Sequence, residues 1–319
     1  VALVLAPLVA SHGLEYLLAA VILGGLLQVL LAAAGIAKLM RFIPRSVMVG
    51  FVNSLAILIA LAQLPGLIDV PWTVYPMVAV GLAIIFLFPK LTTTIPSPLI
   101  AIIVLTAITV IAAINVPNVG DEGKLPDSLP SLLIPDVPYT LETLKVIFPY
   151  ALAMALVGLM ESLMTAKLVD DITDSHSDKT RESWGQGVAN VVTGCFGGMG
   201  GCAMIGQTMI NVKVSGARTR LSTFLAGVFL LILVVALGDV VSIIPMAALV
   251  AVMLFVAYST FDWHSVKPST LRRLPKTETF VMAITVVVVV ATHNLAIGVI
   301  VGVVVAMVMF ARRVAHMAE

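Results

Sequence analysis

Residues Gly194–Thr208 read GCFGGMGGCAMIGQT, and this stretch decides the fold. Each glycine inside a helix costs about 1 kcal/mol relative to alanine, so the stretch predicts a break between helices. The segments around it are apolar and long enough to span a bilayer, where broken backbone must lie within protein or beside a water-filled cavity. The stretch is therefore either a surface loop between helices or the start of a short helix whose free N–H groups face an anion inside the membrane.

The composition decides the class of protein. Of the 319 residues, 60% are hydrophobic and 11% are charged, and the mean hydropathy is +1.12. Soluble domains carry about 25% charged residues. The sequence therefore predicts an all-α polytopic membrane protein. The net charge is only +1, and the basic residues are scattered among the loops, so nothing indicates a nucleic-acid partner.

Twelve apolar segments follow one another along the chain. They cover residues 1–10, 14–36, 45–64, 73–89, 97–114, 143–168, 184–196, 203–213, 217–237, 243–260, 278–292 and 294–311. A complete helical span needs about 20 residues. The segments at 1–10 and 203–213 have about half that length, so we expect two half-helices.

The distribution of basic residues predicts the orientation. If every segment crosses, or half-crosses, in turn, sixteen of the eighteen Lys and Arg residues fall on one side. The other two, Lys124 and Lys145, lie on or near the opposite loop at 115–142. The positive-inside rule then places the sixteen residues and the C-terminus in the cytoplasm. The pattern requires the segment at 203–213 to count as a crossing element.

The loop at 115–142, rich in Pro, Asp and Gly, divides the chain into two related halves, residues 1–114 and 143–319. Ile43-Pro44 and Ile244-Pro245 open corresponding apolar segments, and each pair follows a long segment that follows a short one. We expect an extracellular or periplasmic linker at 115–142 and two repeats of opposite orientation. Inverted repeats with broken helices are a transporter architecture.

Glu161 lies in the middle of an apolar segment, with Ser162 beside it and Thr165 one helical turn later. An acidic residue within a membrane is costly and usually faces a cavity and a partner. The oxygen-rich face suits Na⁺, or a proton on Glu161 itself. The alternative is a polar patch that only bonds neighbouring helices.

Gly206, Gln207 and Thr208 fall at the start of the short 203–213 segment, where side-chain donors join free backbone N–H groups. Gly206 would let an anion approach the backbone closely, and simple helix capping is the alternative. We expect Cys195 and Cys202 to be small buried residues. Four acidic residues follow Glu161 on a helix end that we expect to be solvated: Asp170, Asp171, Asp174 and Asp178. The sequence has no nucleophile, phosphate-loop or zinc spacing, so we expect no enzyme.

Several stretches resemble the SulP family of anion transporters, the sulfate permease and solute carrier 26 group. They are GQGVANVVTGCFGG at 185–198, NVKVSGARTRL at 211–221 and IPMAALVAVMLFVAYSTFDW at 244–263, together with ESLMT at 161–165 in the place of the family's acidic eighth helix. The resemblance implies fourteen segments in two inverted repeats of seven, arranged in core and gate domains. About twelve segments are present here. By that pattern the chain begins within the third segment and lacks the C-terminal STAS domain.

The resemblance also implies site residues. The family's anion lies at the N-terminal ends of its third and tenth helices, which carries over to Ala203, Met204, Gly206, Gln207 and Thr208. The family's bicarbonate transporters bind Na⁺ through eighth-helix side chains and tenth-helix backbone. The matching cation-coupling positions here are Glu161, Ser162, Thr165, Ala203 and Ile205. Two positions depart from the pattern: Ile205 replaces a sodium-binding Thr, and Met199-Gly200-Gly201 lacks a common Pro.

Together these features predict a secondary active transporter of a small inorganic anion, sulfate or bicarbonate, coupled to H⁺ or Na⁺. Its core would comprise residues 1–36 and 143–237, and its gate residues 45–114 and 243–311. We expect no cofactor other than Na⁺ as a coupling ion. The family tends to form homodimers, and the expected location is the inner (plasma) membrane. The alternatives are a truncated, non-transporting membrane protein or scaffold, and an uncoupled anion channel.

Overall fold

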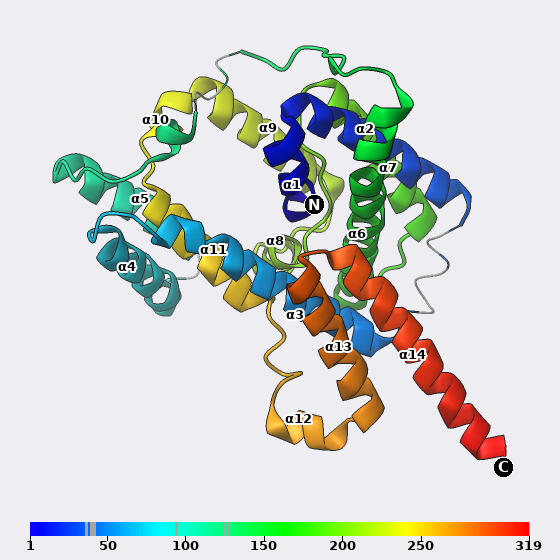
Figure 1. Cartoon of the computed structure of the whole chain (residues 1–319). Helices are drawn as coiled ribbons and strands as arrows, with labels where there is room; N and C mark the ends of the chain where they lie inside the picture. Colours follow the sequence, from blue (N-terminus) through cyan, green and yellow to red (C-terminus); the bar gives the residue numbers. More distant parts are fainter. Residues whose placement is uncertain (36–37, 39–42, 93–94, 124–125, 127, 319) are drawn as a thin grey trace. The chain divides into compact units, whose positions relative to one another are not determined.

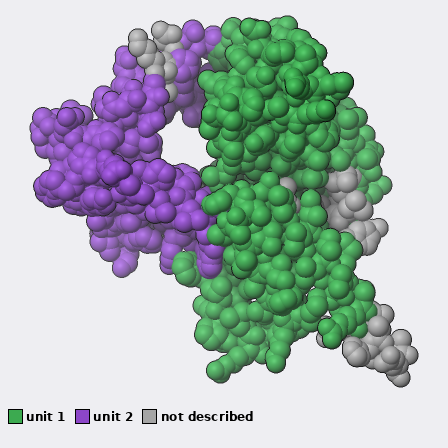
Figure 2. Space-filling model, viewed as in Figure 1, with its two compact units in different colours: residues 1–54, 130–218, 262–319 green, residues 55–129, 219–261 purple. Residues whose placement is uncertain are grey.

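The computed structural model describes residues 1–318, except 36–37, 39–42, 93–94, 124–125 and 127. The chain forms two compact units, coloured separately in Figure 2. Unit 1 contains residues 1–54, 130–218 and 262–319, and unit 2 contains residues 55–129 and 219–261. Each of the twelve predicted apolar segments coincides with a helix. Arg41 and Lys124, which entered the charge count, lie outside the described residues.

The helices of unit 1 come from three parts of the chain (Figure 1). They are α1 (Ala2–His12), α2 (Leu14–Ala33), the first half of α3 (Arg45–Ala62), α6 (Leu141–Thr173), α7 (Lys179–Cys195), α8 (Ile205–Met209) continued by the π-helical turn η5 (Ile210–Val214), α12 (Pro268–Arg273), α13 (Lys276–Thr292) and α14 (Leu295–Ala318). Segments 203–213 and 1–10 are thus short helices, as the sequence predicts.

Two glycines bring α2 and α7 into backbone contact. A Cβ atom on Gly25 would lie 2.7 Å from the carbonyl oxygen of Gly187, and one on Gly187 would lie 2.8 Å from the carbonyl oxygen of Gly25. Small residues allow this approach and drive helix association in membranes, where lipid is as apolar as leucine. The apolar core of α1, α2 and α6 adjoins this seam and contains Leu5, Leu8 and Met154.

A second small-residue seam joins α3, α13 and α14. A Cβ atom on Gly50 would lie 2.9 Å from the carbonyl oxygen of Met282, and one on Gly302 would collide with the Thr285 hydroxyl oxygen. Asn53 extends the seam, because its amide donates to the Ser265 hydroxyl over 2.9 Å. As a result α13 and α14 belong to the same compact unit as α1 and α2, whereas α9 belongs to unit 2. The compact units therefore differ from the residue ranges that we expected for core and gate.

Unit 2 contains the second half of α3 and the following elements: η2 (Leu64–Leu67), α4 (Val74–Leu87), η3 (Phe88–Lys90), α5 (Ser97–Ile111), η4 (Val119–Glu122), α9 (Arg220–Ala236), α10 (Gly238–Ser242) and α11 (Met246–Thr260). An apolar core joins α4, α5 and α11 and includes Ile85, Leu105 and Ala248. Part of the 115–142 loop is fixed here, because the Val119 N–H donates to the Ile244 carbonyl over 3.0 Å.

The Ile-Pro pairs and the helix lengths agree with the repeat pattern. Pro44 directly precedes α3 and Pro245 is the N-cap of α11, positions where proline leaves no helical hydrogen bond unmade. Among the described residues, three helical stretches have the length and composition to cross a membrane: Leu14–Ala33, Arg45–Leu67 and Leu141–Thr173. Shorter apolar helical stretches of 10–17 residues include Ala2–His12, Val74–Lys90, Ser97–Ile111, Arg220–Ala236, Met246–Thr260 and Ile297–Arg312.

Candidate functional site

The middle of α6 carries a cluster of buried polar side chains in unit 1. Glu161, Ser162 and Thr165 are each only 2% exposed. Glu161 and Thr165 lie four residues apart, so both side chains project from one face of the helix. Buried polar groups need hydrogen-bonding partners, because an unsatisfied one costs about 1–3 kcal/mol. Those partners come from the non-helical segment before α8.

The backbone of Gly201–Ala203 is hydrogen-bonded from two helices. On the α7 side, the Gly201 N–H donates to Asn190 Oδ1 over 2.8 Å, and Asn190 Nδ2 donates to the Gly201 carbonyl over 3.1 Å. On the α6 side, the Ala203 N–H donates to Ser162 Oγ over 2.9 Å. Thr165 Oγ1 lies 2.9 Å from the Ala203 carbonyl oxygen. Side chains thus satisfy the backbone groups that the glycine-rich break would otherwise leave unpaired.

The Thr165 hydroxyl has more acceptors than protons. Its Oγ1 also lies 2.8 Å from the carbonyl oxygen of Glu161, so two carbonyls compete for one hydroxyl proton. The Glu161 carboxylate accepts a hydrogen bond from the Cys202 thiol, with Sγ 3.1 Å from Oε2. Among the described residues, no basic side chain forms an ion pair with Glu161. The result is a buried, oxygen-rich cluster whose one acidic group forms no ion pair with any other residue that the structure describes.

The short helix α8 begins at Ile205, and the Thr208 N–H donates to the Met204 carbonyl over 3.2 Å. None of its five residues is buried, and Gln207 is exposed. Arg218 closes the far end of the helical segment, because its Nη1 donates to the carbonyls of Val212 and Ala217 over 2.8 and 2.9 Å. A cation at a helix C-terminus is favourable.

A cavity of about 470 Å³ lies between α7, α6 and the Gly201–Ala203 segment. Its lining includes Ser162, Cys202 and Ala203, together with Gln186 and Asn190 of α7. The remaining predicted site residues do not line it: Glu161, Thr165, Met204, Ile205, Gly206, Gln207 and Thr208. Of the predicted cation-coupling residues, only Ser162 and Ala203 therefore line this cavity.

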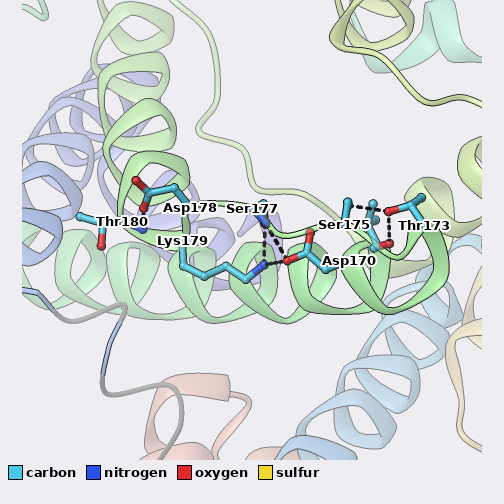
Figure 3. Close-up of polar contacts among 8 residues, drawn as sticks. Asp170, Thr173, Ser175, Ser177, Asp178, Lys179 and Thr180 are labelled. Carbon is cyan, nitrogen blue, oxygen red and sulfur yellow. Dashed lines mark hydrogen bonds and ion pairs between the residues drawn. The ribbon is translucent and has the colours of Figure 1, made fainter.

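The acidic residues after Glu161 organise the turn from α6 to α7 (Figure 3). Asp170 pairs with Lys179 and also accepts from the backbone and hydroxyl of Ser177 over 3.1 and 3.0 Å. Asp178 caps α7 by accepting from the Thr180 and Arg181 N–H groups. The Asp170 side chain is 15% exposed, so it is less solvated than the sequence suggested. The described residues contain no group of three or more His, Cys, Asp or Glu placed to hold a metal ion.

Sequence reasoning missed Asn190 and the bond between Cys202 and Glu161. Both cysteines are free thiols of intermediate exposure, so the expectation that they are buried was wrong. Asn190 stands out only as an amide in the apolar run VANVV, and nothing in the sequence shows which backbone it binds. Gln28 of α2, fully buried and bonded to Asn190, was missed for the same reason.

These features define a polytopic helical membrane protein with short helices at the two half-length segments and a buried polar cluster around Glu161 beside α8. The sequence profile of the Sulfate permease family matches residues 1–84 and 70–285. The chain belongs to this family. It has 55% identity to YbaR of Bacillus subtilis over 316 residues, which is 99% of this chain and 66% of YbaR. The chain thus spans about two thirds of that relative's length.

Solved structures show the same fold. The transmembrane domain of a cyanobacterium bicarbonate transporter, BicA, matches with a TM-score of 0.75 and 22% identity, over 96% of this chain and 80% of that chain. The murine anion transporter Slc26a9 in its inward-facing state matches with a TM-score of 0.74 and 17% identity, over 95% of this chain and 53% of that chain. The fold is therefore the all-helical inverted repeat of this group, as the sequence predicts.

Proposed function

We propose that the protein is a secondary active transporter of a small inorganic anion, sulfate or bicarbonate, driven by H⁺ or Na⁺. Membership of the Sulfate permease family supports this, and YbaR carries "sulfate transporter" in its name. BicA, which shares the fold, is described as a bicarbonate transporter. The proposal includes the plasma membrane as the location, a cytoplasmic C-terminus and a homodimeric state.

The observation that carries the proposal is the environment of Glu161. Burying an ionised carboxylate without a positive partner is costly, and such groups inside membranes mark ion or proton pathways. Ser162 Oγ, Thr165 Oγ1 and the Ala203 carbonyl supply further oxygens on the same side of α6. Hard cations such as Na⁺ prefer oxygen ligands, and a proton on Glu161 would equally remove the uncompensated charge. Either cation would offset the negative charge of a bound anion.

The proposed anion site comprises the backbone and side chains of Ala203, Met204, Gly206, Gln207 and Thr208. Free N–H groups at the start of α8 favour an anion, and the Gly206 position lets it approach the backbone closely. Ala203 belongs to both sites, because its carbonyl faces Thr165 and its peptide leads into α8. This shared residue would couple cation binding to anion binding. Alternating exposure of the two sites would then carry both ions across the membrane.

The test is the Glu161→Gln variant, assayed in liposomes for sulfate and bicarbonate uptake under imposed Na⁺ and H⁺ gradients. The amide keeps the size of the side chain and removes the charge that binds the cation. We expect wild-type uptake to be stimulated by one gradient, and we expect the variant to lose that stimulation. Glu142→Gln is the matched control, because Glu142 lies on the same helix but is exposed in its first turn.

Each outcome separates the alternatives. Uptake by Glu161→Gln that still follows the cation gradient would contradict the role of Glu161. Wild-type flux that neither saturates nor responds to Na⁺ or H⁺ would favour an uncoupled channel. An absence of anion flux from well-folded wild-type protein would favour a scaffold.

A further inference from the structure

Asn190 projects from α7 and is 3% exposed, and its hydrogen bonds go to Gly201 and Gln28, which are not among the proposed ion-site residues. Its amide makes two hydrogen bonds to one residue, accepting from the Gly201 N–H and donating to the Gly201 carbonyl. Only an amide side chain both donates and accepts in this planar arrangement. The two bonds resemble the pair of hydrogen bonds between opposite residues of two β-strands. They therefore fix the orientation of the Gly201 peptide groups as well as their position.

A second amide fixes Asn190 itself. Asn190 Nδ2 also donates to Gln28 Oε1 of α2 over 2.8 Å, and Gln28 is fully buried. Gly158 of α6 makes room for Gln28, because a Cβ atom there would lie 2.9 Å from Gln28 Nε2. The backbone seam at Gly25 and Gly187 holds α2 and α7 at the distance this pair needs.

Two independent supports therefore meet on three consecutive residues. The α2–α7 pair holds Gly201 through Asn190, and α6 holds Ala203 through Ser162 and Thr165. A glycine-rich segment has little conformational preference of its own, so these bonds must select its conformation. Cys202 lies between the two supports, and in this arrangement its thiol donates to Glu161.

We propose that Asn190 is a positioning residue that holds the Gly201–Ala203 segment in register with α6. This keeps the Ala203 carbonyl beside Thr165 and the Cys202 thiol beside Glu161. The effect of Asn190 on ion coupling rests on the proposed function. Its effect on the conformation of the Gly201–Ala203 segment does not, because that effect concerns only the local structure around Cys202.

The experiment uses Cys202 as a built-in reporter. Cys195 is replaced by serine, and the labelling rate of Cys202 by a small maleimide is measured on the protein in liposomes, alongside its thermal unfolding. Asn190→Ala removes both bonds to Gly201, so we expect labelling at least about tenfold faster. Asn190→Asp keeps the acceptor and loses the donor, so we expect an increase of about threefold. Uptake by both variants should need a higher concentration of the coupling cation.

The controls separate positioning from general stability. Ser183→Ala is matched because Ser183 is buried on α7 and its hydroxyl donates within the helix, to the Lys179 carbonyl. It should leave Cys202 labelling within about twofold of wild type. If Asn190→Ala does not fold, Gln28→Met removes the acceptor for Asn190 and should speed labelling about threefold.

Labelling within about twofold of wild type in a folded Asn190→Ala or Gln28→Met variant would overturn the inference, even if the protein transports anions. Faster labelling in a protein without anion flux would instead support the positioning role and contradict the proposed function. A variant with lower thermal stability and unchanged labelling would also overturn the inference, because that is the signature of packing alone.

Discussion

The helices α1 and α8 of unit 1, which fall at the two half-length apolar segments, are held in different ways. Val4, Leu5 and Leu8 of α1 are buried, and Leu5 and Leu8 belong to an apolar core with residues of α2 and α6. The five residues of α8 include none that is buried, and the backbone of the segment before it makes four hydrogen bonds to side chains of α6 and α7. Both helices fall at the half-length segments that we expect to correspond in the two repeats. Corresponding elements can therefore be fixed by different forces.

The difference predicts different tolerance to change. Apolar packing responds to volume and accepts other side chains of similar size. Hydrogen bonds to a fixed backbone group depend on the donor or acceptor itself, and losing one leaves a buried polar group unpaired. We therefore expect α1 to govern the stability of unit 1. The Gly201–Ala203 segment should instead govern the geometry of the proposed site.

The largest expected effect on stability comes from Leu8→Ala in α1, where the side chain is fully buried. The cavity should lower the free energy of unfolding by roughly 2 kcal/mol, at the lower end of core truncations. We expect the lower end because lipid tails are as apolar as leucine, so moving Leu8 from lipid into the protein core contributes little hydrophobic free energy. Denaturation of the purified protein in detergent measures this change. Leu8→Met, which keeps the volume, should cost much less, and an equal loss in both variants would contradict packing as the cause.

The second largest effect is expected from a change in the hydrogen bonds that hold the Gly201–Ala203 segment. Ser162→Ala removes the acceptor for the Ala203 N–H, and an unpaired N–H costs about 1–2 kcal/mol. Cys202 labelling should accelerate, and the cation concentration for half-maximal uptake should rise. Ser54→Ala is the matched control, since this buried hydroxyl donates to the Phe51 carbonyl of its own helix. Equal labelling of Cys202 in both variants would remove Ser162 from the support of the segment.

The smallest effect should follow Arg218→Gln at the other end of the α8–η5 helical segment. Arg218 donates to the Val212 carbonyl, so the change removes a helix C-terminal cation that is worth about 0.5 kcal/mol. Thermal unfolding with and without added salt measures the loss, which should shrink at high ionic strength. Arg220→Gln, on an exposed residue at the start of α9, is the comparison. A salt-independent loss would indicate packing of the arginine stem.

The helices were predictable because their signals are local. Runs of apolar residues gave all twelve segments, and Pro44 and Pro245 marked two helix starts correctly. Extra short elements such as α10 and α12 were not predicted, because five or six residues carry no measurable periodicity. The two compact units could not be predicted, because glycine seams such as Gly50 against Met282 join helices that are far apart in sequence.

The candidate site was only partly predictable. Glu161, Ser162 and Thr165 could be named because polar residues within an apolar span are rare and costly. Asn190 could not be assigned, because its partner Gly201 is determined by the path of the chain between α7 and α8. The thiol of Cys202 likewise gained its contact with Glu161 only through that path.

The sequence by itself determined a helical membrane protein with two short helices and an acidic residue inside the apolar part of α6. These features follow from the composition of the chain and from the spacing of apolar and polar residues along it, which can be read without knowing any tertiary contact. Only the tertiary structure decided that two amides and two hydroxyls hold the glycine-rich break, because glycine leaves the backbone free to adopt many conformations. Side chains from α2, α6 and α7 select one of them, and no local pattern encodes that choice.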